Sequence, residues 1–215
     1  MKRILENNQD YFIGADKAQQ YRKSSEKSSS ARFANFLATL KKLDIKGRYL
    51  EIGSGPGFLT QTIAREHIGI AITAVDISPE MTAIANEGLP KELKTRVSFL
   101  SGDINNEKMR LDLGKFDLIY STFSFHHWDD AQQTVTSLYS LLNPNGVIYL
   151  YDLKRVSWLY WIKSKSGFFK SIRAAYRPAE IKTMLDNLGI NHYSVKTIFP
   201  FFLLSVFIRN NSCNR

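Results

Sequence analysis

The chain of 215 residues has very little cysteine and no long apolar run. Its one cysteine, Cys213, cannot form a disulfide within the chain, and a cysteine-based zinc cluster is excluded. The longest apolar run, residues 198–208, is too short to cross a bilayer and contains Pro200. The first twelve residues are charged and polar where a secretory signal needs an apolar centre. These absences predict a cytoplasmic protein.

Acidic side chains are scarce at both ends of the chain. Residues 1–48 have a net charge of +6, residues 49–153 of −6, and residues 154–215 of +9. An acidic centre between two basic ends favours an anionic partner for the ends. A charged surface that only keeps the protein soluble is an equally good explanation.

Short apolar runs alternate along the chain with segments of helical periodicity. The alternation predicts an α/β protein with a parallel, doubly wound sheet and right-handed crossovers. The two last strands lie close enough in sequence to form an antiparallel pair, and Asp129 is expected to cap the helix of residues 129–142. The expected strands are residues 47–53, 71–78, 97–103, 116–124, 147–153, 192–199 and 202–209, and the expected helices are residues 30–43, 57–67, 79–89, 129–142 and 178–189.

A glycine-rich turn, LEIGSGPG at residues 50–57, follows the first expected strand. Such a turn at the carboxyl end of a strand, before a helix, is where an open α/β sheet binds its ligand. A P-loop is excluded because no Gly-Lys-Ser/Thr follows. A dinucleotide-binding turn is poorly matched, because its third glycine position is occupied by Phe58.

The pattern E-x-G-x-G-x-G is matched by Glu51, Gly53, Gly55 and Gly57. With it, residues 45–153 resemble the class I S-adenosylmethionine (SAM)-dependent methyltransferases, especially the small-molecule group that includes ubiquinone- and menaquinone-type enzymes. The resemblance implies a seven-stranded sheet of order 3-2-1-4-5-7-6 whose last strand is antiparallel, with N-terminal helices and a helical cap after the fifth strand. An acidic centre suits a cationic cofactor.

The resemblance also implies which residues bind SAM. Asp76 at the end of the second strand would accept hydrogen bonds from the ribose hydroxyls, and Asp103 would accept one from the adenine amino group. The full expected set is Glu51, Gly53, Ser54, Gly55, Gly57, Asp76, Ile77, Met81, Asp103, Ile104 and Ser121. Each residue alone has an ordinary structural explanation, such as a helix cap for Asp76 or core packing for Met81, so the prediction depends on the set.

Methyl transfer requires mainly that a nucleophile be held in line with the sulfonium methyl group. A general base is needed only if that nucleophile loses a proton. The candidates are His126, His127 and Asp152, at the ends of the fourth and fifth strands. No metal site is predicted. The alternatives are a SAM-binding partner protein without catalysis and a nicotinamide-dependent oxidoreductase.

Residues 154–177 have seven lysines and arginines, six aromatic residues and no acidic residue. We expect a cap that receives a small anionic or amphipathic acceptor, with Lys154, Arg155 and Arg173 holding it. The alternatives are a cap that only packs on the sheet, a peripheral contact with a membrane surface, and contact with nucleic acid, for which no binding module is visible. The predicted organisation is a lid segment (1–44), a SAM-binding core (45–153), the cap (154–177) and a closing helix with antiparallel strands (178–215).

Overall fold

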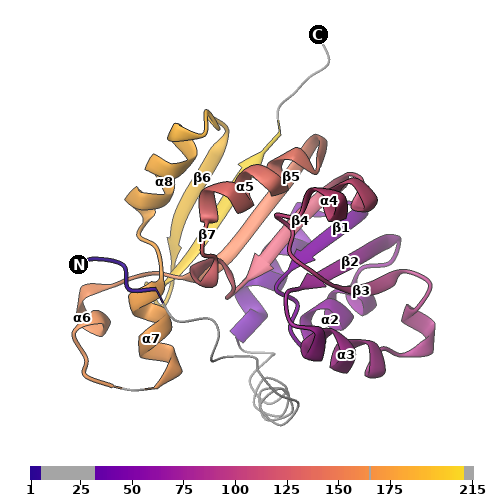
Figure 1. Ribbon diagram of the computed structural model, residues 1–215, viewed down its shortest axis with the longest axis horizontal. Coiled ribbons are helices and arrows are strands. Elements are labelled where there is room, and N and C mark those ends of the chain that lie inside the picture. The colour runs from indigo at the N-terminus through magenta and orange to yellow at the C-terminus, as the bar shows by residue number, and fades with distance from the viewer. Residues whose placement is uncertain (6–31, 165, 211–215) are drawn as a thin grey trace.

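The computed structural model describes residues 1–5, 32–164 and 166–210. Its centre is a seven-stranded sheet of order β3-β2-β1-β4-β5-β7-β6 (Figure 1). Neighbouring strands from β3 to β5 pair in parallel, and β7 is antiparallel to both β5 and β6. The predicted topology is confirmed. The strands are β1 (Gly47–Ile52), β2 (Ile70–Asp76), β3 (Val97–Ser101), β4 (Phe116–Thr122), β5 (Leu142–Leu153), β6 (Tyr193–Ile198) and β7 (Leu203–Arg209).

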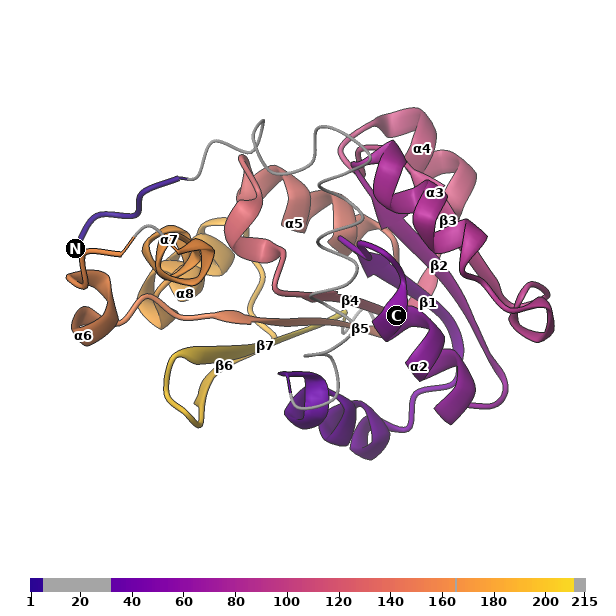
Figure 2. The same ribbon diagram turned by 90° about the horizontal axis from the view of Figure 1, so that it is seen from below.

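Helices cover both faces of this sheet, which Figure 2 shows nearly edge-on. The helix of residues 32–43, α2 and α3 contribute to one apolar core, in which Phe36 stacks on Tyr149 at 4.9 Å between ring centroids. Helices α4, α5 and α8 contribute to the second core on the other face. The helices are α2 (Phe58–Glu66), α3 (Pro79–Glu87), α4 (Glu107–Leu113), α5 (Ala131–Ser140), α6 (Ser157–Tyr160), α7 (Gly167–Ala174) and α8 (Pro178–Asn187), with 3₁₀ turns η2 (Lys91–Leu93) and η3 (Phe125–His127).

The structure corrects three local expectations. The cap of α5 is Asp130, whose side chain accepts from the N–H of Gln133, so the prediction of Asp129 was wrong. Residues 142–146, which precede the expected strand of residues 147–153, also belong to β5. Among them, Asn145 has φ 63°. Helix α4 was not predicted. Leu113 is its one buried residue, so its sequence has no apolar periodicity to recognise.

The segment between β5 and α8 forms two short helices, α6 and α7. Its backbone is joined to the β6–β7 turn where Lys154 N–H donates to Phe202 O at 2.7 Å, and its two ends meet where Arg155 N–H donates to Tyr176 O at 3.2 Å. No described helix is both long and apolar enough to cross a membrane. The predicted lid segment lies mostly outside the described residues, which include its first five residues and the helix of residues 32–43.

Candidate active site

The glycine-rich turn connects β1 to α2 at the carboxyl edge of the sheet. All three of its glycines have positive φ, at 75°, 52° and 78° for Gly53, Gly55 and Gly57, a region that other residues adopt at a cost. A Cβ on Gly53 would lie 2.4 Å from Ser124 Oγ, and one on Gly57 would lie 2.5 Å from Phe99 Cζ. Gly57 is therefore required by packing of α2 against β3, and Gly53 by the approach of the turn to the loop after β4.

Asp76, the last residue of β2, is hydrogen-bonded to the glycine-rich turn. Its Oδ2 accepts from Gly55 N–H at 2.7 Å, and its Oδ1 accepts from Ser78 N–H at 2.9 Å. Burial raises the pKa of Asp76, and the two backbone hydrogen bonds oppose that shift. Each carboxylate oxygen has a second lone pair, so the group can still accept from a ligand.

Glu51 is the most deeply buried acid of the site, at 1% exposure. Its Oε2 accepts from Thr60 Oγ1 at 2.5 Å and from Tyr120 OH at 3.0 Å. Desolvation raises the pKa of Glu51 to about 7, because both hydrogen bonds only partly offset the loss of water. A cation nearby would favour its ionised form.

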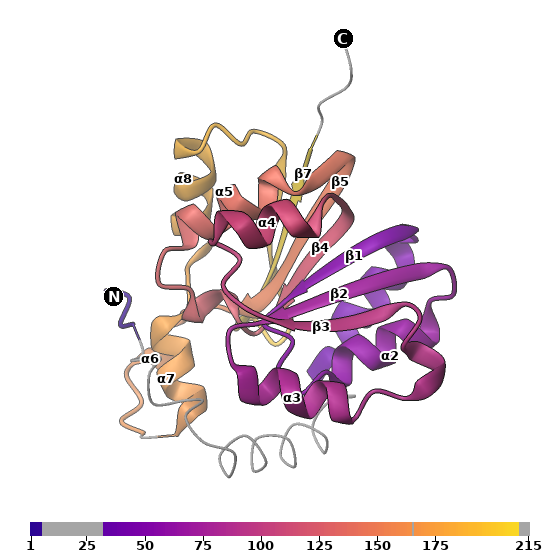
Figure 3. The same cartoon turned by 45° about the vertical axis from the view of Figure 1, so that its right-hand side comes forward.

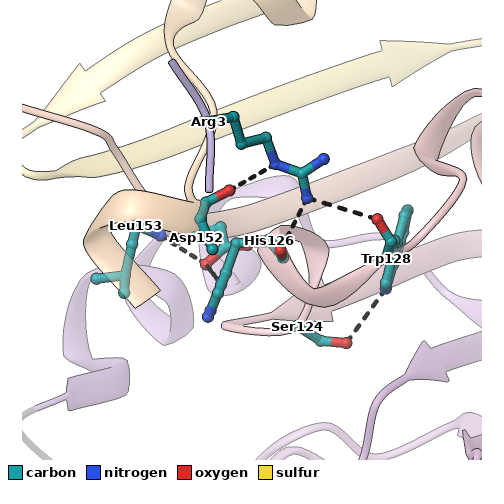
Figure 4. Close-up of polar contacts among 7 residues, drawn as sticks. Arg3, Ser124, His126, Trp128, Asp152 and Leu153 are labelled. Atoms are coloured by element: carbon teal, nitrogen blue, oxygen red, sulfur yellow. Dashed lines mark hydrogen bonds and ion pairs between the residues drawn. The ribbon is translucent and has the colours of Figure 1, made fainter. Parts of the chain in front are cut away.

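His126 and Asp152 form a buried pair at the ends of β4 and β5 (Figure 4). Asp152 Oδ1 lies 2.7 Å from His126 Nδ1, and its Oδ2 accepts from the His126 backbone N–H at 2.7 Å. The carboxylate partner favours the tautomer with hydrogen on Nδ1. Among the described residues, His126 Nε2 has no hydrogen-bond partner. The pair therefore leaves one basic nitrogen available.

Arg3, near the N-terminus, holds the loop that carries His126. Arg3 donates to His126 O at 2.9 Å and to Ala174 O at 2.6 Å, and its guanidinium lies 4.0 Å from the ring centroid of Tyr176.

Desolvation by burial, with the neighbouring His126 as the next cause, lowers the pKa of His127 to about 4. His127 is consequently neutral at physiological pH.

A cavity of about 1340 Å³ joins these features. It is larger than the roughly 300–1,000 Å³ of an ordinary ligand pocket. The predicted residues that line it are Glu51, Gly53, Ser54, Gly55, Asp76, Ile77, Asp103, Ile104, His126 and His127. Gly57, Met81, Ser121 and Asp152 are not among its described lining residues, and Met81 instead packs in a small core with Ile84.

The cavity also has an aromatic wall, which the sequence did not predict. It is formed by Phe33, Phe123, Trp128 and Tyr151. Phe123 forms its centre, with ring centroids 5.8 Å from Phe33 and 5.4 Å from Tyr151, and the guanidinium of Arg32 lies 4.0 Å over its ring. Phe123 has φ 52°, a strained conformation that clusters at functional sites. Trp128 also lines the cavity, and its indole N–H donates to Ser124 Oγ at 3.2 Å. The only sequence signal was a cluster of aromatic residues beside a strand end.

The cap arginines do not meet the expectation of acceptor contact. Arg155 is 2% exposed, donates to Ala175 O at 2.9 Å and forms an ion pair with Glu180. Arg173 donates to the backbone oxygens of Ile162 and Ser164. Both hold the cap together. Among the described residues, no group of three or more His, Cys, Asp or Glu side chains is arranged to hold a metal ion.

Sequence comparison relates the centre of the chain to methyltransferases. A methyltransferase domain family matches residues 50–148. A malonyl-[acyl-carrier protein] O-methyltransferase of Priestia megaterium is 38% identical over 97 residues, which is 45% of this chain and 33% of that protein. An uncharacterized methyltransferase of Bacillus mycoides is 38% identical over 109 residues, or 49% of this chain and 47% of that one. The chain thus spans about a third to a half of the length of these relatives.

Solved structures extend the likeness in fold to most of the chain. The plantazolicin methyltransferase BpumL in complex with SAH has a TM-score of 0.74 at 18% identity, covering 94% of this chain and 93% of that one. A SAM-dependent methyltransferase of Aquifex aeolicus has a TM-score of 0.71 at 19% identity, covering 90% and 98%. Residues 50–148 thus match a methyltransferase domain family, and the strand order and the glycine turn agree with the fold of the solved methyltransferases.

Proposed function

We propose that this protein is a SAM-dependent methyltransferase that acts on a small anionic or amphipathic acceptor. The observation that supports this most is a single cavity of about 1340 Å³ that is lined by the acidic strand ends, by the aromatic wall and by Gly167, Phe168 and Ser171 of the cap. Its size gives room for two molecules, whereas a simple binding site needs room for one.

The acidic side of the cavity fits the cofactor. Asp76 and Asp103 lie at the ends of β2 and β3, where their carboxylates would accept from the ribose and the adenine. The turn at Gly53–Gly55 lets the methionine part approach the backbone. Bound SAM supplies the methyl group and a positive charge. Glu51 favours a cation nearby.

The His126–Asp152 pair gives the site a proton acceptor. If the acceptor's nucleophile carries a proton, His126 would take it at Nε2 while Asp152 holds Nδ1–H and stabilises the resulting imidazolium. The aromatic wall excludes water from the nucleophile. An acceptor that is already ionised, such as a carboxylate, would need no base, and the pair would then only orient the loop.

The acceptor's class is inferred from the cap. Phe168 and Phe202 line the cavity on this side, and the exposed Lys163 and Lys170 lie on the same segment. Apolar lining with cations outside it suits a molecule with an apolar part and a negative group. One relative is named a malonyl-[acyl-carrier protein] O-methyltransferase, and a malonyl group ends in a carboxylate.

Calorimetry with SAM and, separately, with NADH tests the cofactor assignment. We expect SAM and S-adenosylhomocysteine to bind and NADH to show no heat above dilution, and the reverse result would favour the oxidoreductase alternative. Release of S-adenosylhomocysteine with a panel of carboxylate and amphipathic metabolites then tests turnover. Tight SAM binding without release on any panel would favour a non-catalytic SAM-binding protein.

A further inference from the structure

One end of the molecule exposes most of the large apolar side chains that the described residues leave in solvent. Twelve such side chains are exposed, and eight of them belong to the N-terminal residues, the α6–α7 segment and the turn between β6 and β7. We call these eight the apolar rim: Ile4, Leu5, Trp158, Trp161, Ile162, Phe168, Phe199 and Phe201. Trp161 and Phe199 are 72% and 70% exposed. A soluble surface scatters such residues singly, whereas a cluster marks an interaction site.

Contacts between the three segments keep the rim together. Tyr160 OH donates to Lys2 O at 3.0 Å, and Ile4 N–H donates to Arg173 O at 3.1 Å. The ring of Phe202, in the β6–β7 turn, lies 6.3 Å from Trp158 and 5.6 Å from Phe168 between centroids. Figures 1 and 3 show the N-terminal residues beside α6 and α7. Segments far apart in the sequence thus build one surface.

The charges around the rim have one sign. Lys2, Lys163, Lys170 and Lys196 are exposed, and residues 1–5, 154–177 and 187–210 contain no Asp or Glu. Two acids lie between the last two of these ranges: Glu180 is engaged by Arg155, and Asp186 accepts from Tyr193 OH at 2.6 Å. The surface therefore combines exposed aromatic groups with exposed ammonium groups.

The rim also borders the cavity. Phe168 and Phe199 line the cavity while remaining 40% and 70% exposed, and Pro200 and Phe202 line it between them. Anything that covers the rim therefore lies next to the space where the acceptor is expected.

We propose that the apolar rim docks on an anionic lipid bilayer, so that an amphipathic acceptor enters the cavity from the membrane interface. Tryptophan and other aromatic side chains favour the interfacial zone, and lysines are attracted by anionic headgroups. A protein partner is a poorer match, because protein interfaces are depleted in lysine. The inference goes beyond the proposed function, since docking on lipid requires no methyl transfer.

Co-sedimentation with vesicles tests the docking directly. With phosphatidylcholine vesicles that contain phosphatidylglycerol, we expect binding at low salt, release as salt is raised, and much weaker binding to phosphatidylcholine alone. Two of the three tryptophans, Trp158 and Trp161, are in the rim, so their emission should shift to shorter wavelength on binding. No co-sedimentation at low salt would overturn the proposal, as would binding to RNA or to an acidic protein in place of vesicles.

Two double variants test whether vesicle binding depends on the apolar rim or on any exposed apolar side chain. The double substitution of Trp161→Ala and Phe199→Ala should weaken vesicle binding at least tenfold. The control is Ile68→Ala with Leu111→Ala, which are 85% and 76% exposed elsewhere on the surface. Equal loss in both double variants would overturn the assignment to the rim. Because all four side chains are exposed, circular dichroism should show an unchanged fold.

A charge pair completes the test. Lys163→Gln with Lys170→Gln should weaken binding to anionic vesicles about thirtyfold, from the usual attraction of two lysines near such a surface. The matched control is Lys91→Gln in η2 with Lys108→Gln in α4, two exposed positions outside the cap segment. Equal loss with the control pair would mean that net charge, and not the rim, attracts the vesicle.

Discussion

Asp152 holds His126 at two points, because one carboxylate oxygen lies 2.7 Å from the ring Nδ1 and the other accepts from the backbone N–H at 2.7 Å. Both residues are at most 3% exposed. The geometry fixes the ring and its tautomer together, which is what a proton acceptor needs.

Replacement of His126 by Gln should therefore lower kcat by about 10²–10⁴ with an acceptor whose nucleophile is protonated. Asp152→Asn should also lower kcat, through loss of ring orientation. SAM affinity measured by calorimetry should stay within a few fold, and His192→Gln, at an exposed position, is the control. Unchanged kcat in His126→Gln would remove the base from the mechanism.

Asp76→Ala should weaken SAM binding by about 1.5–3 kcal/mol, the range for hydrogen bonds to a charged group. Two effects contribute, because the carboxylate would bind the ribose and also holds Gly55 N–H in the turn. Calorimetry measures the loss, with Asp112→Ala on exposed α4 as the control. Equal SAM affinity in both variants would place the ribose elsewhere.

Two glycines of the turn should respond differently to substitution. A Cβ on Gly57 meets the Phe99 ring, so Gly57→Ala should destabilise the fold by about 1–3 kcal/mol in urea unfolding. Gly55→Val should abolish SAM binding, because a branched side chain blocks the approach of a ligand to the backbone, with a smaller cost in stability from its positive φ. Normal SAM binding by Gly55→Val would contradict the assignment of the turn.

The raised pKa of Glu51, about 7 against an ordinary 4.5, predicts a pH dependence of stability. Between these two values the folded state binds more protons than the unfolded state, so the free energy of unfolding falls as pH rises from about 4.5 to about 7. Above about 7 both states are ionised and this effect is constant. Glu51→Gln removes this pH dependence. The free energy of unfolding of the wild type minus that of the variant should therefore fall by a few kcal/mol across that window and then level off. A constant difference from pH 5 to 8 would contradict the shifted pKa.

Arg155→Gln should act on folding rather than on the acceptor. Its guanidinium is buried and satisfies Ala175 O and Glu180, so its loss should cost about 1.5–3 kcal/mol of stability. Lys154→Gln, beside it and half-buried, should cost much less. Chemical denaturation of the two variants gives the comparison, and similar stabilities would mean that Arg155 is not structural.

The strand order, the glycine turn and the acidic strand ends could be predicted, because each follows from local patterns and from the family resemblance. Arg155 and Arg173 were misread, since composition shows charge but not partners. Arg155 is engaged by Ala175 O and by Glu180, and Arg173 by backbone oxygens of residues 162 and 164. The aromatic wall could not be predicted either. Phe33 has the spacing of a core residue on an amphipathic helix, and only the fold shows that it lies beside Phe123 at the cavity.

The hydrogen bonds from Arg3 to His126 and Ala174 have a consequence for the order in which the parts of the protein fold during synthesis. Arg3 is synthesised well before its partners His126 and Ala174, which follow it by 123 and 171 residues. The glycine turn and its acidic neighbours, from Glu51 to Asp103, are complete before either partner emerges. During translation, these strand ends can thus take shape first, and the loop that carries His126 can be held in place only after α7 has been made.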